Sequence, residues 1–268
     1  MACKGNKQLT KENLEWAFEE FKAARNAPHS RWLSWEHCFG QFATVFEDLQ
    51  GGRRAAGDID DKQIDYLSLH LAFFLASWGM MRGSTKLLQH DYKVHAPLIP
   101  VVLNYSDLYG RDLSDFSEPQ TFERFAALHE DVVKHCEQFS NAKGYEASDT
   151  LVGKIMMGTL GIAPAYDKFV STAVKKYGIS YGKFSTDNFR KFAAYFTENH
   201  ADITKRMTKD AQKLCPLYTR AKVIDALLWF IREETVQIKQ TGHWQRSFKP
   251  HCKRCLSLPK TPKTRSFL

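Results

Sequence analysis

Apolar residues recur at every third or fourth position along most of this chain, and this periodicity is what most limits the folds available to it. Between residues 10 and 24, for example, Leu14, Phe18 and Phe21 fall on one face of a helix. The alternation of apolar and polar residues that indicates a half-buried strand is weak everywhere. The periodicity therefore predicts an all-α protein. No internal repeat of the kind that builds a solenoid is visible.

Ten segments show the helical pattern, and capping residues or breakers mark several of their ends. Thr10 and Thr121 are expected N-caps, because a threonine hydroxyl can accept a hydrogen bond from the first helical turn. Pro97 and Pro100 are expected to bracket a short extended or turn segment. The predicted helices are 10–24, 34–49, 60–81, 101–109, 121–139, 151–160, 169–177, 186–199, 201–214 and 218–235.

The size of the chain sets limits on its organisation. Its 268 residues are enough for one large domain, or for two small lobes that share a cleft, without the help of disulfide bonds. Residues 241–268 are polar, basic and proline-bearing, which predicts a partly disordered tail. The lysines and arginines of this tail either follow a phosphate backbone or only keep the protein in solution.

The charge balance and the cysteines bear on partners and compartment. Lysine and arginine number 38 against 30 aspartates and glutamates, a formal net charge of +8. Such a surface attracts nucleic acid, but a basic surface without that partner has the same composition. The chain starts without an apolar signal-peptide core, and its greasiest stretch, 67–81, is too short to cross a bilayer and predicts a buried helix. Six scattered cysteines lack disulfide spacing, so we expect a cytoplasmic protein with no membrane anchor.

Three further groups of residues have ordinary explanations beside functional ones. His90 and His95 could be metal ligands, but without a third ligand at a matching spacing we expect exposed polar residues. Cys252 and Cys255 form only half of a zinc site. Lys222 and Asp225, three apart on a late helix, are expected to pair across its surface. We therefore expect no metal and no cofactor.

The most informative segment is 151–177, where an apolar helix runs into Pro164-Ala165-Tyr166-Asp167. The order is an apolar helix, a glycine, a proline, an aspartate and a second helix with apolar residues at helical spacing. This order resembles the centre of the helix-hairpin-helix DNA glycosylase superfamily, over roughly a tenth of the chain. The residues that match are Ile155, Met156, Leu160, Gly161, Pro164, Asp167, Val170 and Val174.

The resemblance implies a fold and an activity. The fold would be an all-α bundle of two lobes around a central cleft, within a single domain 1–240 whose lobes are about 1–140 and 141–240. The activity would be that of a DNA glycosylase, which cleaves the N-glycosidic bond of a modified or damaged base flipped out of double-stranded DNA. A bacterial enzyme that acts on modified bacteriophage DNA, in antiviral defence, is one form of this expectation. No obligate protein partner is implied.

The resemblance also implies roles for individual residues. Asp167 would be the catalytic carboxylate, because a fixed carboxylate can stabilise an oxocarbenium-like sugar and orient water. The side chains expected to bind the flipped base or the DNA are Tyr166, Trp78, Arg82, Ser84, Tyr92 and Lys154.

Two departures from the family pattern lie just upstream. The glycine-rich hairpin that grips a DNA phosphate is replaced by residues 144–150, which keep only Gly144 and add Glu146 and Asp149. Thr150 stands where the lyase members of the family carry a lysine that forms a Schiff base, so we expect a monofunctional enzyme.

Other interpretations of the same residues stay open. Asp167 also has the sequence position of a helix N-cap, and both roles can hold together. The chain could be a non-catalytic helical nucleic-acid-binding or regulatory protein. A helical protein whose basic surface meets an acidic protein is a third hypothesis.

Overall fold

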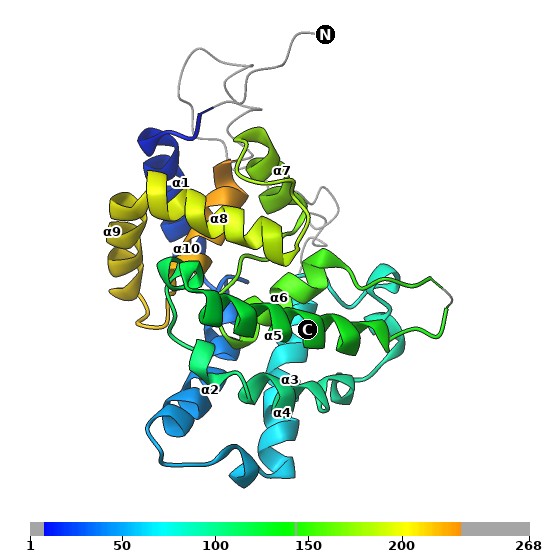
Figure 1. Cartoon of the computed structure of the whole chain (residues 1–268). Helices are drawn as coiled ribbons and strands as arrows, with labels where there is room; N and C mark the ends of the chain where they lie inside the picture. Colours follow the sequence, from blue (N-terminus) through cyan, green and yellow to red (C-terminus); the bar gives the residue numbers. More distant parts are fainter. Residues whose placement is uncertain (1–7, 143, 232–268) are drawn as a thin grey trace, which may run out of the picture. The chain divides into compact units, whose positions relative to one another are not determined.

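The computed structural model describes residues 8–142 and 144–231. Within these ranges the chain forms ten α-helices joined by loops and short 3-10 turns, with no strand, so the prediction of an all-α protein is confirmed (Figure 1). The helices are α1 Lys11–Asn26, α2 Leu33–Gln50, α3 Asp61–Ser77, α4 Leu98–Leu103, α5 Pro119–Glu137, α6 Asp149–Thr159, α7 Lys168–Lys176, α8 Thr186–Asn199, α9 Ala201–Gln212 and α10 Arg220–Ile231.

Some helix ends follow the predicted signals and others do not. Thr10 caps α1 as predicted, because its hydroxyl accepts a hydrogen bond from the backbone N–H of Asn13. Thr121 does not cap α5, since the helix already begins at Pro119, whose missing N–H suits a first turn. The short extended or turn segment expected between Pro97 and Pro100 is instead helical from Leu98 onward. Pro100 lies in the first turn of α4, where its N–H would have had no partner within the helix.

Helix α3 is shorter and more exposed than predicted. It ends at Ser77, and Gly79 follows in the left-handed region at φ 71°, so the helix does not continue to residue 81. Its inner face is buried. Three large side chains on its outer face are about half exposed or more, so the prediction of a buried helix is wrong for that face: Tyr66 48%, Leu69 48% and Phe73 62%.

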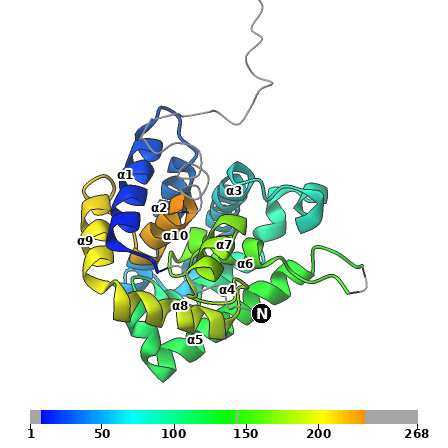
Figure 2. The same cartoon turned by 90° about the horizontal axis from the view of Figure 1, so that it is seen from above.

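The packing of the helices joins distant parts of the chain. Helix α1 packs against α9 and α10, and α10 also contacts α7. Helices α2, α3 and α5 all contact α6, which is buried from Leu151 to Thr159 (Figures 1 and 2). Contacts therefore cross the lobe boundary expected near residue 140, and the division into two lobes stays a prediction. The two most buried helices, α6 and α10, carry the polar residues described below.

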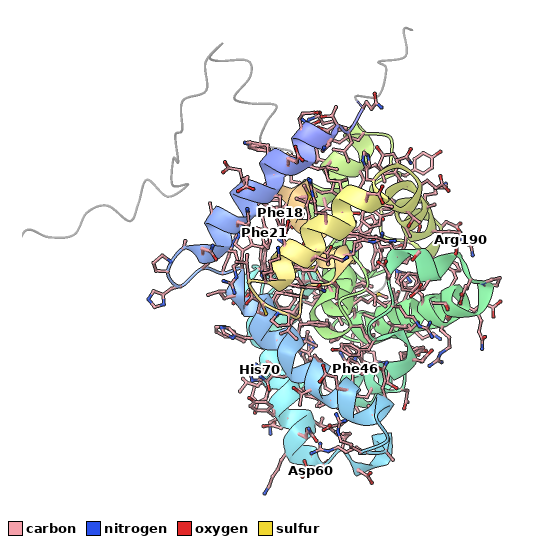
Figure 3. All side chains as sticks on the ribbon, turned by 90° about the vertical axis from the view of Figure 1, so that its left-hand side faces the viewer. Phe18, Phe21, Phe46, Asp60, His70 and Arg190 are labelled. Atoms are coloured by element: carbon pink, nitrogen blue, oxygen red, sulfur yellow. The ribbon has the colours of Figure 1, made fainter. Side chains whose placement is uncertain are left out.

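Aromatic rings fill much of the core. Figure 3 shows Phe18 and Phe21 on α1 and Phe46 on α2 among the packed helices, whereas Arg190 lies on the outside. The Phe21 ring is fully buried, and its centroid lies 5.5 Å from the rings of Trp32 and Tyr218. These edge-to-face contacts fix α1 to the residues just before α2 and α10.

The segment 90–95 is less exposed than its composition suggests. His90 contacts the backbone oxygen of Phe139 at 3.0 Å through its Nε2. His95 is fully buried, so the expectation of an exposed polar residue is wrong for it. Its ring lies 6.0 Å from that of His135. Among the described residues, no group of three histidine, cysteine or acidic side chains is arranged to hold a metal ion.

Two findings concern the membrane and the cysteines. No helix of residues 8–142 or 144–231 is long and apolar enough to cross a bilayer. Cys38, Cys136 and Cys215 are free thiols, and the first two are buried. Cys252, Cys255 and the basic tail 241–268 lie outside the described residues.

Candidate functional site

The site is built around the turn that connects α6 to α7. Gly161 follows Leu160, the C-cap of α6, and adopts φ 68°, a conformation that costs glycine little and that turns the chain away from the helix. The backbone oxygen of Gly161 accepts a hydrogen bond of 2.6 Å from the hydroxyl of Thr219, just before α10. The start of the turn is therefore hydrogen-bonded to the residue that precedes α10.

The turn then crosses back over α6 at close range. A Cβ atom on Gly153 would lie 2.8 Å from the backbone oxygen of Ala165 and 2.9 Å from that of Pro164. Real side chains do not approach a backbone so closely, so only glycine allows this crossing. Gly153 thus allows the turn to lie directly on the surface of α6.

Replacing Gly153 by alanine should destabilise the protein by about 1–3 kcal/mol, because the new methyl group meets backbone that cannot move away freely. In an unobstructed helix the same change would be stabilising. Gly57→Ala is the control, since nothing lies within 4 Å of a Cβ there. Urea denaturation measures both. A Gly153→Ala protein as stable as the wild type would contradict the close crossing.

Tyr166 holds the turn in an unusual conformation. Its φ is 44°, in the left-handed region that a tyrosine rarely adopts. Its backbone oxygen accepts hydrogen bonds from the hydroxyls of Thr150 (3.2 Å) and Ser171 (3.0 Å). Its ring is buried, with its centroid 4.8 Å from that of Phe184. Tyr166, expected to line a base pocket, instead anchors the turn in the core.

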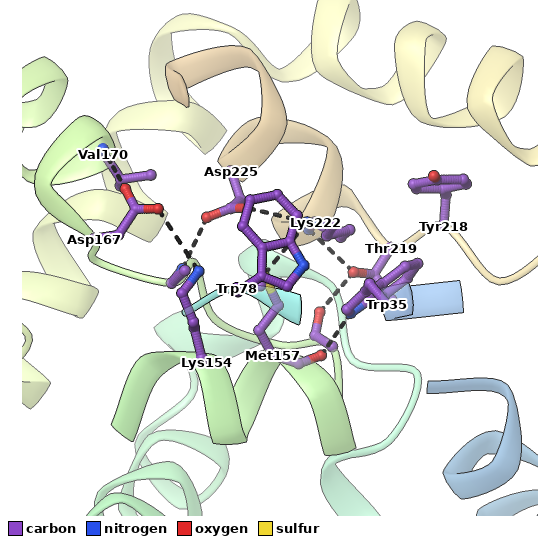
Figure 4. A network of polar contacts seen from close by, with 12 residues as sticks. Trp35, Trp78, Lys154, Met157, Asp167, Val170, Tyr218, Thr219, Lys222 and Asp225 are labelled. Atoms are coloured by element: carbon purple, nitrogen blue, oxygen red, sulfur yellow. Dashed lines mark hydrogen bonds and ion pairs between the residues drawn. The ribbon is translucent and has the colours of Figure 1, made fainter. Parts of the chain in front are cut away.

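Asp167 uses its two carboxylate oxygens differently. Oδ1 accepts hydrogen bonds from the backbone N–H groups of Phe169 (2.9 Å) and Val170 (3.1 Å), which makes Asp167 the N-cap of α7. Oδ2 lies 3.6 Å from Nζ of Lys154 (Figure 4). The cap interpretation is confirmed, and the same bonds hold the second oxygen in one orientation.

Lys154 is the first of two buried lysines in the site. It lies on α6 with its side chain 3% exposed, and Nζ is 4.6 Å from the centroid of the Trp78 ring. Burial lowers the pKa of Lys154, while the charges of Asp167 and Asp225 act in the opposite direction. Trp78 and Lys154, both predicted site residues, thus meet beside Asp167.

Lys222 and Asp225 pair as predicted, but inside the protein rather than on its surface. Nζ of Lys222 lies 3.1 Å from Oδ2 of Asp225, and neither side chain is more than 6% exposed. Oδ1 of Asp225 accepts a hydrogen bond of 2.8 Å from the backbone N–H of Ala165. The Lys222 ammonium also lies over the rings of Trp32 (5.1 Å), Trp35 (5.6 Å) and Trp78 (5.6 Å). The pair therefore holds the turn from the side of α10.

Arg31, which precedes α2, is a site residue that the sequence did not indicate. Its guanidinium carbon lies 4.5 Å from the centroid of the Trp78 ring and 5.4 Å from that of Trp229. Although much of the side chain is exposed, the guanidinium end lies against these rings. Burial lowers the pKa of Arg31, and Asp167 acts in the opposite direction. No local motif marks Arg31, because its neighbours are Trp78, the C-cap of α3, and Trp229 of α10.

The remaining predicted residues lie elsewhere. The hydroxyl of Tyr92 donates to the carboxylate of Asp65 on α3, at 3.0 Å. Arg82 and Ser84 are exposed in the loop after α3. Within residues 8–142 and 144–231, no hydrogen bond or ion pair joins these three side chains to Asp167, and their role in binding stays a prediction.

Lys154 and Lys222 do leave a signal in the sequence. Each stands among apolar residues on a helix buried nearly all round, where a lysine needs a partner. Such a position indicates a buried carboxylate nearby, although it does not say which one.

The site as a whole combines fixed charges with aromatic faces. Three cationic side chains, Arg31, Lys154 and Lys222, surround the carboxylates of Asp167 and Asp225. Such an arrangement can bind an anion and can present a carboxylate in a fixed direction. Comparison of the chain with protein-family models, with curated proteins and with solved structures finds no match.

Proposed function

We propose that this protein is a DNA N-glycosylase that hydrolyses the bond between a modified or damaged base and its sugar, with Asp167 as the carboxylate that faces the sugar. The observation that carries the proposal is the division of labour between the two oxygens of Asp167. Oδ1 accepts hydrogen bonds from two backbone N–H groups. Oδ2 lies beside the buried ammonium of Lys154, and the Asp167 side chain as a whole is 14% exposed. The resemblance of segment 151–177 to helix-hairpin-helix glycosylases supports the same role.

Hydrolysis of the N-glycosidic bond requires little from the protein beyond this fixed carboxylate. As the bond between C1′ and the base nitrogen breaks, positive charge develops on the sugar, and Asp167 stabilises it without having to reorient. A water molecule then forms a bond to C1′ from the side on which the carboxylate lies. The water gives up a proton as this bond forms, and the departing base takes up a proton. The attraction of Lys154 keeps Oδ2 in place.

The position of Lys154 bears on whether the protein would also have lyase activity. The expectation of a monofunctional enzyme rested on Thr150, but Lys154, one turn further along α6, lies against Asp167. We retain hydrolysis by water, because the Lys154 side chain is only 3% exposed whereas that of Asp167 is 14% exposed. A buried, paired ammonium is poorly placed to attack a sugar.

The test incubates the protein with normal, damaged and hypermodified duplexes, the last including bases found in bacteriophage DNA, and measures abasic sites by alkaline cleavage. We expect abasic sites on at least one duplex, none with Asp167→Asn, and no covalent adduct after borohydride reduction. Asparagine keeps an oxygen for the helix cap and removes the charge. Asp60→Asn, the same change at the cap of α3, is the control and should leave activity unchanged.

A non-catalytic nucleic-acid-binding protein is the second candidate, and one observation favours it. Both oxygens of Asp167 already have partners inside the protein, which is the arrangement of a purely structural residue. This candidate predicts salt-sensitive DNA binding that Asp167→Asn leaves intact, and no product on any duplex. The absence of abasic sites on every substrate would decide against the glycosylase.

A further inference from the structure

Of the three cations in the site, Arg31 is the one without a carboxylate partner among the described residues. Lys154 lies beside Asp167, and Lys222 beside Asp225. Among the described residues the Arg31 guanidinium forms no ion pair and donates no hydrogen bond, so its contacts are the faces of Trp78 and Trp229. A guanidinium has five N–H donors in a planar fork, and stacking on rings uses none of them.

The immediate surroundings of Arg31 favour an anion over a neutral ligand. With all five groups ionised, the three cations and two carboxylates of the site sum to +1. Arg31 is the exposed member, whereas the two lysines are buried. A negatively charged ligand that reaches the site therefore meets the Arg31 guanidinium before the other two cations.

Aromatic rings fix the Arg31 guanidinium close to the helix that Asp167 caps. Trp78 and Trp229 are half-buried, and the ring of Phe169, the second residue of α7, lies 4.8 Å from that of Trp229. These rings hold the guanidinium in place, and arginine binds phosphate through paired N–H donors. Phe169 also donates its backbone N–H to Asp167, so the aromatic group and the carboxylate belong to one structural unit.

We infer that Arg31 binds a backbone phosphate of the nucleic acid next to the nucleotide that faces Asp167. This inference rests on the proposed function in taking a nucleic acid as the ligand. It does not require that the protein cleaves a base from that nucleic acid. In this chain the contact takes the place of the glycine-rich hairpin, of which residues 144–150 retain only Gly144. The phosphate is bound by a side chain from the segment just before α2, far in sequence from the α6 helix that carries Lys154.

The test measures the dissociation constant of a fluorescently labelled duplex by anisotropy, with Asp167→Asn as the background so that no product forms. Salt is varied from about 0.05 to 0.3 M, because each phosphate contact contributes roughly 0.9 to the slope of log Kd against log salt. Arg31→Gln should reduce that slope by about 1 and raise Kd roughly fivefold to tenfold at 0.1 M salt. Arg31→Lys should keep most of the slope.

Arg190→Gln is the matched control. Arg190 is an exposed arginine of α8 whose guanidinium carbon lies 3.7 Å from the centroid of the Phe122 ring, so it shares the stacking but not the site. Its replacement should leave the slope unchanged. An unchanged slope in Arg31→Gln, or no binding of any duplex at low salt, would overturn the inference. A reduced slope without abasic sites from the wild type would keep the inference and reject the glycosylase.

Discussion

Replacing Lys222 by methionine should lower the free energy of unfolding by about 3–5 kcal/mol, since it leaves the carboxylate of Asp225 buried without its counter-charge. The ammonium and carboxylate are 3.1 Å apart, and their side chains are 1% and 6% exposed. Water cannot take the place of the lost ammonium at such depth. The midpoint of urea denaturation, with its slope, measures the loss.

Two further variants show whether the burial is the cause. Lys213→Met breaks a pair of the same spacing with Asp210, but on the surface, and should leave the midpoint unchanged. Lys222→Met combined with Asp225→Leu should regain part of the loss, because no uncompensated charge remains. It should not regain all of it, since the N–H of Ala165 loses its acceptor. A Lys222→Met protein as stable as Lys213→Met would contradict the buried pair.

Acid should destabilise the protein well above the pH at which most carboxylates take up protons. Burial lowers the pKa of His95 to about 3, with a further contribution from the charge of His135 and of His90, and burial lowers the pKa of His135 to about 4. Both rings are therefore neutral in the folded protein at pH 5, whereas the unfolded chain protonates them below about pH 6.5. Their contribution to stability is complete above pH 6.5 and is lost as the pH falls.

The fall in the free energy of unfolding is set by the number of protons that the unfolded chain binds and the folded protein does not. Each histidine should lower the free energy of unfolding by about 1.4 kcal/mol per pH unit between roughly pH 6 and 4. Neither ring nitrogen of His95 has a hydrogen-bond partner among the described residues, so nothing compensates a proton there. Chemical denaturation at a series of pH values measures this slope.

The variant that isolates this effect is His95→Leu, which removes one buried ring. It should show a shallower fall in stability over the same pH range than the wild type. His37→Gln, a change at an exposed position of α2, should follow the wild type. If His95→Leu and wild type have parallel profiles, the acid sensitivity comes from other groups.

Most of the fold could be predicted from local patterns. The boundaries of α8 match the prediction at both ends, because Ser185 caps the helix and an amphipathic pattern continues to Asn199. The cap of α7 by Asp167 was also foreseen, since a cap depends only on residues next to it in sequence. Local signals failed at Pro119 and Pro100, where a proline was compatible with a first helical turn.

The candidate site was less predictable, because its contacts join residues far apart in the chain. The position of Asp167 relative to Lys154 depends on the path of the turn between them. Asp225 of α10 and Gly153 of α6 set that path, and no pattern within the turn indicates either. The spacing of Lys222 and Asp225 predicted their pair but not its burial, which three tryptophans from other segments provide.

The most direct test of the account is the rate of base release in a single turnover, with enzyme in excess and the duplex fully bound. Asp167→Asn is expected to bind the duplex as tightly as the wild type and to release the base at least about 100-fold more slowly. Equal rates of release in the two proteins would contradict a catalytic role for Asp167 and leave it as the N-cap of α7.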